Sequence, residues 1–195
     1  MRRRLLVATG SSHKLAELRQ LLDLPNTDLV SLADVGITDE VDETGATFED
    51  NALLKARHVW RELGGAEWVL ADDSGIAAGA LGGAPGVRSA RFAGEHATDE
   101  QNLQKLLDSL AGTGDRRVAY VTVLVAISPD ADERVVRGEL RGTLATEPRG
   151  TGGFGYDPAF VPEGESRTVG EMSAGEKDAI SHRARAAAAL RQLLP

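Results

Sequence analysis

The stretch Trp68-Val69-Leu70-Ala71-Asp72-Asp73-Ser74-Gly75 runs from four apolar residues into two adjacent carboxylates, a hydroxyl and a glycine. Its apolar part predicts a buried β-strand that ends at Ala71. Burying a carboxylate is costly unless a cation or several donors compensate, so acid at a strand end is typical of a site for Mg²⁺ and phosphate. Asp-Asp-Ser-Gly is equally common in turns, and this segment alone leaves both interpretations open.

The composition is that of a globular chain with a small-molecule partner. Its 195 residues are 42% hydrophobic, which is enough for a core in one domain or in two closely joined lobes. The formal net charge of −8 disfavours nucleic-acid polymers and anionic membranes as partners. A small anionic ligand needs only a local cluster of donors and a metal, so nucleotide binding stays open.

The chain contains no cysteine, which excludes disulfides, thiolate zinc sites and cysteine nucleophiles. We therefore expect a cytoplasmic protein. Residues 2–4 are all arginine, but the apolar run that follows at 5–8 is too short for a signal-peptide core. No segment is expected to span a bilayer.

Strands and helices are predicted to alternate in the first part of the chain. Residues 5–9 and 29–32 are typical of short strands, and a helix follows the first of them, with Ser11 or Ser12 as its cap. Capping-box patterns, in which a hydroxyl residue is followed three positions later by an acid or amide, predict three more helix starts. They lie at Thr47 with Asp50, Thr98 with Gln101, and Ser173 with Glu176.

The second part of the chain is predicted to add an antiparallel ribbon. Residues 118–127 form a long β-run, and residues 134–146 alternate apolar with polar side chains. The helix that begins after Ser173 is predicted to continue through Leu194. Together these elements predict a single α/β domain over residues 1–195, a mixed sheet with flanking helices in two lobes around a central cleft.

Two segments of the first half are candidates for binding phosphate and metal. Thr9-Gly10-Ser11-Ser12-His13-Lys14 lies between a strand and a helix, where unpaired N–H groups and the helix dipole form a phosphate cradle, although an ordinary helix entry is the alternative. The acidic pair Asp42 and Glu43 could share a metal with the aspartates of the strand, or form a solvated acidic loop. Lys55 could reach a phosphate or lie on the helix surface.

Two segments of the second half are candidates for binding a base. In Thr151-Gly152-Gly153-Phe154-Gly155-Tyr156-Asp157-Pro158, Phe154 could stack on a flat ring, or both aromatics could be tucked inward. Lys177 and Ser181, four residues apart, are predicted to share a helix face, next to His182 and Arg183. No serine-histidine-acid order and no zinc spacing is recognisable, which disfavours nucleophilic and zinc mechanisms.

Taken together with Gly82-Gly83-Ala84-Pro85-Gly86, these motifs resemble those of the inosine triphosphate pyrophosphatase family, also called dITP/XTP pyrophosphatases. The resemblance covers nearly the whole chain in order. It implies an elongated two-lobed α/β sheet, a homodimer, and Mg²⁺-dependent hydrolysis of ITP, dITP and XTP to the monophosphate and pyrophosphate. Such an enzyme would cleanse the nucleotide pool.

The resemblance also implies roles for particular residues. Asp73 would be the metal-linked proton acceptor, beside the substrate-contacting Ser74, with Asp42 or Glu43 as a further metal ligand. The triphosphate would be bound by Thr9, Gly10, Ser11, Ser12, His13 and Lys14. Lys55 is a further substrate-binding candidate on its position alone. The nucleoside pocket would consist of Phe154, Gly155, Tyr156, Asp157, Lys177, His182 and Arg183. The family usually has asparagine where this chain has Ser11, so a weaker or water-bridged contact is expected there.

The hypothesised reaction is in-line attack of water on the α-phosphorus, with Mg²⁺ and lysines neutralising charge on the leaving pyrophosphate. A non-catalytic nucleotide sensor and a phosphatase that releases orthophosphate are the alternatives. Because neighbours on a strand point to opposite faces, Asp73 can face the metal only if Asp72 faces away, held by backbone donors or a lysine.

Overall fold

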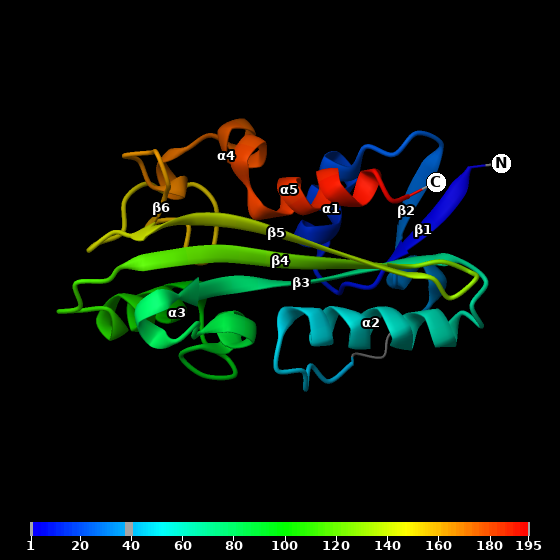
Figure 1. The fold of residues 1–195 in the computed structure, drawn as a ribbon, viewed down its shortest axis with the longest axis horizontal. Coiled ribbons are helices and arrows are strands. Elements are labelled where there is room, and N and C mark those ends of the chain that lie inside the picture. The colour runs from blue at the N-terminus through cyan, green and yellow to red at the C-terminus, as the bar shows by residue number, and fades with distance from the viewer. Residues whose placement is uncertain (1, 38–40, 195) are drawn as a thin grey trace. The chain divides into compact units, whose positions relative to one another are not determined.

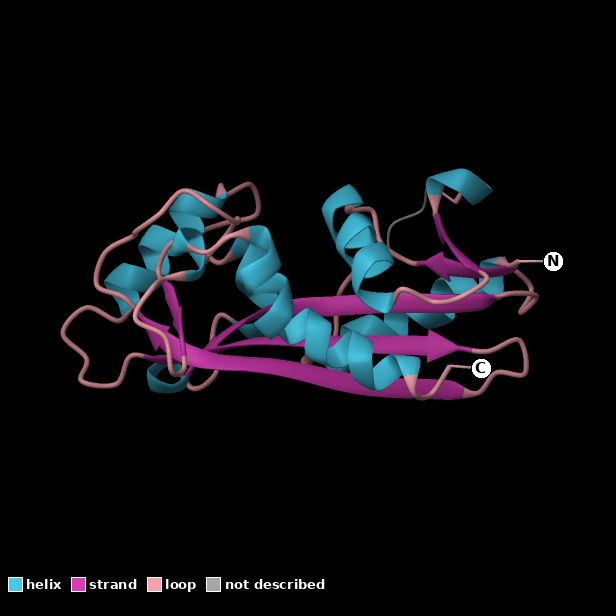
Figure 2. Cartoon of the chain, turned by 90° about the horizontal axis from the view of Figure 1, so that it is seen from above, coloured by secondary structure: helices cyan, strands magenta, loops and turns pink. Residues whose placement is uncertain are grey.

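The computed structural model describes residues 2–37 and 41–194, and within them six strands form one mixed sheet in the order β2-β1-β3-β4-β5-β6 (Figure 1). The strands are β1 Arg3–Val7, β2 Thr27–Ser31, β3 Trp68–Ala78, β4 Arg117–Ile127, β5 Glu133–Leu144 and β6 Phe160–Pro162. β1 pairs in parallel with both β2 and β3, whereas β5 and β6 are antiparallel. A turn of five residues joins β4 to β5, and Figure 2 shows these two strands running in opposite directions.

Five α-helices flank this sheet in the described residues: α1 Ser12–Leu22, α2 Phe48–Glu62, α3 Asp99–Ser109, α4 Ala174–Ile180 and α5 His182–Arg191. Ser11 caps α1, because its side chain accepts a hydrogen bond from the backbone N–H of Lys14. The three predicted capping boxes all form, at Thr47, Thr98 and Ser173. The predicted α/β fold with a mixed sheet and flanking helices is confirmed.

The chain divides into two compact units. One comprises Met1–Asp73, Thr122–Gly138 and Arg183–Pro195, and the other comprises Ser74–Val121 and Glu139–His182. Three strands, β3, β4 and β5, contribute residues to both units. The single domain with a cleft between two lobes stays a prediction.

In the first unit, alternate residues of the strands pack on opposite sides of the sheet. Leu5 and Val7 of β1 and Leu70 of β3 belong to an apolar cluster with α1 and α5, while the intervening Leu6 and Val69 are equally buried. Figure 1 shows α1 and α5 on one side of these strands and α2 on the other. Each β3 residue of this unit is therefore directed either toward α1 and α5 or toward α2.

Three features differ from the sequence-based expectations. The strand predicted to end at Ala71 continues through both aspartates to Ala78, because lysines compensate the two charges and the backbone pairing need not stop. The predicted last helix is two helices, since Ser181 between them has extended backbone (ψ 152°). Strand β6 was not predicted, because a three-residue strand carries no periodicity.

None of the helices in the described ranges has the length and apolar character needed to cross a membrane.

Candidate functional site

Asp72 and Asp73 point to opposite faces of β3, as the sequence predicted from strand geometry. Both carboxylates are buried, with 1% of Asp72 and 5% of Asp73 exposed. Asp72 lies on the side of α1, where Lys14 Nζ is 3.0 Å from its Oδ2. Asp73 lies on the side of α2, where Asn51 and Lys55 both contact it. The two adjacent acids therefore have different partners.

The Asp73 carboxylate has one α2 donor on each of its oxygens. Asn51 Nδ2 donates to Oδ2 at 3.2 Å, and Lys55 Nζ donates to Oδ1 at 3.4 Å. The same Lys55 ammonium lies 3.1 Å from Oε1 of Glu43 in the acidic loop. Lys55 therefore joins two carboxylates that come from different parts of the chain.

Burial and charge shift the proton affinities of this group in defined directions. Burial raises the pKa of Asp73 above its ordinary value, and the negative charge of Glu43 adds to that shift, while Lys55 opposes it. Burial disfavours the charged form of Lys55, but Asp73, Asp72 and Glu43 outweigh this effect and raise the pKa of Lys55. A buried carboxylate with a raised pKa binds a proton more readily than an ordinary carboxylate, which suits Asp73 to act as a proton acceptor.

Asp72 is held ionised on the other face. Its burial opposes ionisation, but the positive charges of Lys14 and Arg183 outweigh that cost and lower the pKa of Asp72. Arg183 is itself buried and donates from Nη1 to Oε2 of Glu17 at 2.7 Å. The expectation that a lysine holds Asp72 is confirmed, and that lysine is Lys14.

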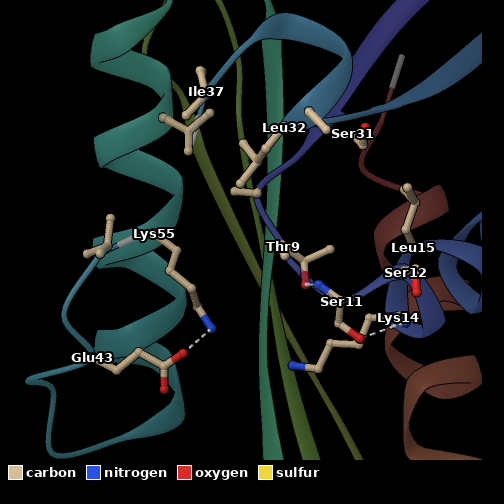
Figure 3. Close-up of a pocket in the computed structure, with 15 residues that line it drawn as sticks. Thr9, Ser11, Ser12, Lys14, Leu15, Ser31, Leu32, Ile37, Glu43 and Lys55 are labelled. Atoms are coloured by element: carbon tan, nitrogen blue, oxygen red, sulfur yellow. Dashed lines mark hydrogen bonds and ion pairs between the residues drawn. The ribbon is translucent and has the colours of Figure 1, made fainter. Parts of the chain in front are cut away.

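A pocket of about 520 Å³ opens in the first unit beside these groups (Figure 3). Lys14 from α1 and Lys55 from α2 point toward one another in this view. The lining residues are Ala8, Thr9, Gly10, Ser11, Ser12, Lys14, Leu15, Ser31, Leu32, Ala33, Ile37, Val41, Glu43, Lys55 and Val59. The structure thus brings most of the predicted triphosphate segment together with Glu43 and Lys55. His13 is exposed and is not among the lining residues. Asp42, which precedes Glu43 in the acidic loop, is also exposed and is not among them either.

The wall of the pocket at α1 is a helix N-terminus. Ser11 N donates to Thr9 Oγ1 at 3.2 Å, and Ser11 Oγ caps the helix. Backbone N–H groups at such a terminus, with the helix dipole and Lys14, provide a site for phosphate oxygens. The Ser11 hydroxyl therefore holds the start of α1, whether or not it also contacts the substrate.

The donor chemistry of this pocket fits a hard divalent cation. Glu43 and Asp73 supply carboxylate oxygens that already share one cation, the Lys55 ammonium. Mg²⁺ binds through one or two carboxylates together with waters and phosphate oxygens, so this donor set is sufficient when a phosphate ligand is present. In the ranges that the structure describes, no three His, Cys, Asp or Glu side chains form a metal cluster on their own.

The second unit contains the glycine-framed aromatic segment. Phe154 is 51% exposed and its ring lies 4.3 Å from Lys177 Nζ, while Tyr156 is buried and donates its hydroxyl to the carbonyl of Ser89 at 2.7 Å. Burial raises the pKa of Tyr156. Of the two interpretations left open by the sequence, exposure holds for Phe154 and inward packing holds for Tyr156. Phe154 is available to stack, and Tyr156 belongs to the core.

A buried Asp157 organises the surroundings of Phe154. Its Oδ2 accepts from the Phe154 backbone N–H at 2.9 Å and from Lys177 Nζ at 2.7 Å, and its Oδ1 accepts from the Tyr120 hydroxyl at 3.0 Å. A Cβ on Gly153 would lie 2.1 Å from that Oδ2, at a backbone φ of +74°. This segment therefore needs glycine at position 153 and a carboxylate at 157.

The predicted nucleoside residues belong to the second unit, apart from Arg183. The imidazole of His182 stacks on Tyr120 with ring centroids 5.0 Å apart, so it joins the group around Asp157 in the second unit. Arg183 belongs to the first unit, where it contacts Glu17. The expectation that Lys177 and Ser181 share a helix face is wrong, because the chain leaves the helix at Ser181.

Ser74 follows Asp73 on β3 and is half-buried, as the first residue of the second unit. Its neighbour Gly75 is tightly packed, because a Cβ there would lie 2.3 Å from Ser89 Oγ. That hydroxyl accepts from the Ile76 N–H at 2.8 Å. The Asp-Ser-Gly order thus combines an acid, a polar side chain and a position without space for any side chain.

Sequence reasoning missed Asn51 and Tyr120. The signal for Asn51 would have been its position one helical turn before Lys55, on the same face of α2. The structure shows that Asn51 is fully buried, and a buried amide must find polar partners. Tyr120 lies within a continuous β-run and carries no such signal.

Comparison with known proteins gives one consistent relationship. Residues 5–193 match the model of the Ham1 family. The dITP/XTP pyrophosphatase of Mycobacterium tuberculosis strain H37Rv is 51% identical over 192 residues, which cover 96% of this chain and 93% of that protein. The dITP/XTP pyrophosphatase of Bacillus subtilis strain 168 is 42% identical over 191 residues, covering 97% and 96%.

Solved structures agree with the fold described above. The Ham1 protein of Staphylococcus aureus is 36% identical, with a TM-score of 0.91 and coverage of 98% of this chain and 97% of that one. The nucleoside-triphosphatase / dITP/XTP pyrophosphatase of Mycobacterium abscessus is 46% identical, with a TM-score of 0.81 and coverage of 98% and 99%.

Proposed function

This chain belongs to the Ham1 family, and from that premise we propose that it hydrolyses noncanonical purine nucleoside triphosphates, namely ITP, dITP and XTP, to the monophosphate and pyrophosphate. Relatives named dITP/XTP pyrophosphatase share about half of its residues over nearly the full length. The observation that carries the proposal is the buried Asp73, with a raised pKa, held by Lys55 at the edge of a pocket that begins at a helix N-terminus.

Water attacks the α-phosphorus in line with the bridging oxygen to the β-phosphorus. Asp73 accepts the proton of that water, the bond to the bridging oxygen breaks, and pyrophosphate leaves. Lys14 and Lys55, together with the N–H groups at the start of α1, bind the phosphate oxygens and offset their charge. Ser74 is proposed to contact the substrate beside Asp73.

The proposed cofactor is Mg²⁺. Asp73 and Glu43 would hold it, and Glu43 is better supported than Asp42 because it lines the pocket and contacts Lys55. Bound there with phosphate oxygens, the cation supplies positive charge that stabilises the transition state and the leaving group.

Selection of the base is proposed to rest on the second unit together with Arg183. Phe154 offers an exposed ring for stacking, and Lys177 and His182 lie in the group around Asp157. Hypoxanthine and xanthine carry a carbonyl acceptor at the purine 6-position, where adenine carries an amino donor. Donors such as Arg183 would favour the carbonyl, and a site built for one pattern rejects the other because buried groups stay unpaired.

Product analysis tests this proposal. The protein is incubated with ITP and Mg²⁺, and the products are separated by ion-exchange chromatography. IMP and pyrophosphate in equal amounts are expected, with a much lower rate for ATP. Orthophosphate with IDP would instead support the phosphatase alternative, and binding without turnover in a single-turnover assay would support the nucleotide sensor. Comparable rates for ATP and ITP would contradict the proposed base selection.

A homodimer, a cytoplasmic location and a single two-lobed domain are further parts of the proposal. Light scattering coupled to size exclusion tests the first of these, with an expected mass of twice the 20.6 kDa of one chain.

A further inference from the structure

Asn51 closes a ring of polar contacts that includes the proposed base. Its Oδ1 accepts from the Gly45 backbone N–H at 2.7 Å, and its Nδ2 donates to Asp73 Oδ2 at 3.2 Å. From Asp73 the ring continues to Lys55 at 3.4 Å and from Lys55 to Glu43 at 3.1 Å. Glu43 is two residues from Gly45, so the ring ends where it began.

We infer that Asn51 is a positioning residue, which fixes the Asp73 carboxylate and the acidic loop that carries Glu43 relative to one another. The inference rests on the proposed function, in which Asp73 accepts the proton of the attacking water. Asn51 is fully buried, and its amide bonds to Asp73 and to the backbone of Gly45, so it acts through Asp73 and not on the substrate.

Two features show that the ring has little freedom. With one donor on each oxygen, both from α2, the carboxylate of Asp73 is fixed in rotation as well as in position. A Cβ on Gly45 would lie 2.6 Å from Asn51 Oδ1, which leaves no space for a side chain between the loop and the amide. A carboxylate held in this way presents the same lone pairs in every turnover, which is the condition for efficient proton acceptance.

A second buried asparagine, Asn102, provides a control for the role of Asn51. Asn102 is also buried, and it also occupies the fourth position of a helix that begins with a capping box. Its Oδ1 likewise accepts a loop N–H, from Ala93 at 2.8 Å, but its Nδ2 donates to the backbone carbonyl of Ala90 at 3.0 Å. Both asparagines hold a loop on a helix, and of the two Asn51 is the one bonded to the proposed base.

Asn51→Asp and Asn102→Asp are therefore compared in the same assays. Aspartate keeps the acceptor for the loop N–H and removes the amide donor, so both variants lose one bond while the shape stays the same. For Asn51→Asp we expect kcat to fall about 100-fold with KM changed by less than about threefold, because the base is misplaced while the pocket is intact. For Asn102→Asp we expect kcat within about twofold of the wild type, whatever its melting temperature.

Asn51→Ala and Asn102→Ala repeat the comparison without the added negative charge, and circular dichroism confirms which variants are folded at the assay temperature. The inference is overturned if a folded Asn51 variant keeps wild-type kcat, or if the two asparagine sites lose kcat equally. It is also overturned if KM rises as kcat falls, since that result would place Asn51 on the substrate. If the wild type released orthophosphate, the proposed function would fail, but the same comparison of kcat would still test Asn51.

Discussion

At the scale of single residues, the two adjacent aspartates have opposite effects on the stability of the folded chain. Asp73 has a raised pKa, so its ionised form is less stable in the folded chain than in the unfolded chain. Asp72 has a lowered pKa, so its ionised form is more stable in the folded chain. One contributes to chemistry at a cost in stability, and the other contributes to stability.

Asp73→Asn is expected to lower kcat by about 10²–10⁴-fold, the usual contribution of a general base. Its free energy of unfolding at pH 7, measured in urea without divalent metal, should be equal to or higher than that of the wild type. The sign follows from the raised pKa, because stability falls as pH rises through the folded-state pKa and the asparagine removes that loss. A variant with wild-type kcat that still binds Mg²⁺ would show that Asp73 is not the base.

Asp72→Asn is expected to lower the free energy of unfolding at pH 7 by about 1–3 kcal/mol, since Lys14 loses a buried ionic partner. Because the pKa of Asp72 is lowered, this contribution is fully present above the unfolded value near 3.8 and is lost as pH falls through the folded value. Urea unfolding of both proteins should therefore show a constant difference from pH 7 down to the unfolded value, and a difference that shrinks only as the pH falls below it. Asp28→Asn is the control, because its ion pair with Arg2 is exposed. Equal losses in the two variants would contradict the prediction.

Phe154→Ala is expected to raise KM for ITP by about 5- to 150-fold, the equivalent of about 1–3 kcal/mol of base stacking. Its melting temperature should change little, because the ring is half exposed. Phe92→Ala is the matched control, since Lys105 lies over that ring at 4.7 Å just as Lys177 lies over Phe154. Phe92 packs on the core, so its loss should lower the melting temperature and leave KM unchanged. If KM rose for Phe92→Ala and stayed unchanged for Phe154→Ala, Phe154 would not be part of the base site.

At the scale of elements, α2 combines a capped start with the two donors to Asp73. The capping box fixes Thr47 and Asp50 at the first turn, so Asn51 follows at a defined orientation and Lys55 lies one turn further on the same face. The acidic loop is tied to this helix through Gly45. The part of the loop at Gly45 and the start of α2 are therefore held together.

Gly45→Ala is expected to lower the free energy of unfolding by about 1–3 kcal/mol, because its Cβ would overlap Asn51 and Asp50. Gly175→Ala in α4 is the control, since a Cβ there has open space, and it should be neutral or stabilising by up to about 1 kcal/mol. Urea unfolding measures both. If the two alanine variants had the same stability, the loop would not be held against α2 as described.

At the scale of the whole molecule, the net charge of −8 opposes the binding of a triphosphate. The described structure offers Lys14 and Lys55 at the pocket, but each is already paired with a buried carboxylate. The chain therefore needs positive charge from outside to bind its proposed substrate strongly.

Removal of divalent metal with EDTA is expected to abolish hydrolysis of ITP, and excess Mg²⁺ should restore it. The melting temperature without substrate should change by only a few degrees, because Lys55 already compensates Asp73 and Glu43 in the metal-free protein. Turnover that persists in EDTA would show that the lysines suffice for the reaction.

The sequence by itself determined the local features of this protein. Apolar periodicity and three capping boxes placed the helix starts, and the period of two in a strand already required Asp72 and Asp73 to point apart. These features depend on neighbours a few residues away, so the local sequence is enough to define them. The specific motifs also carried the family resemblance.

Only the tertiary structure decided which side chains meet. Lys14 could have been a phosphate ligand alone, but folding places it on Asp72, and folding gives Asp73 its two donors from α2. Folding likewise decides that Phe154 is exposed and that Tyr156 is buried in the core. Such contacts join residues tens of positions apart, and their energies arise from burial and charge that exist only once the strands and helices have packed together.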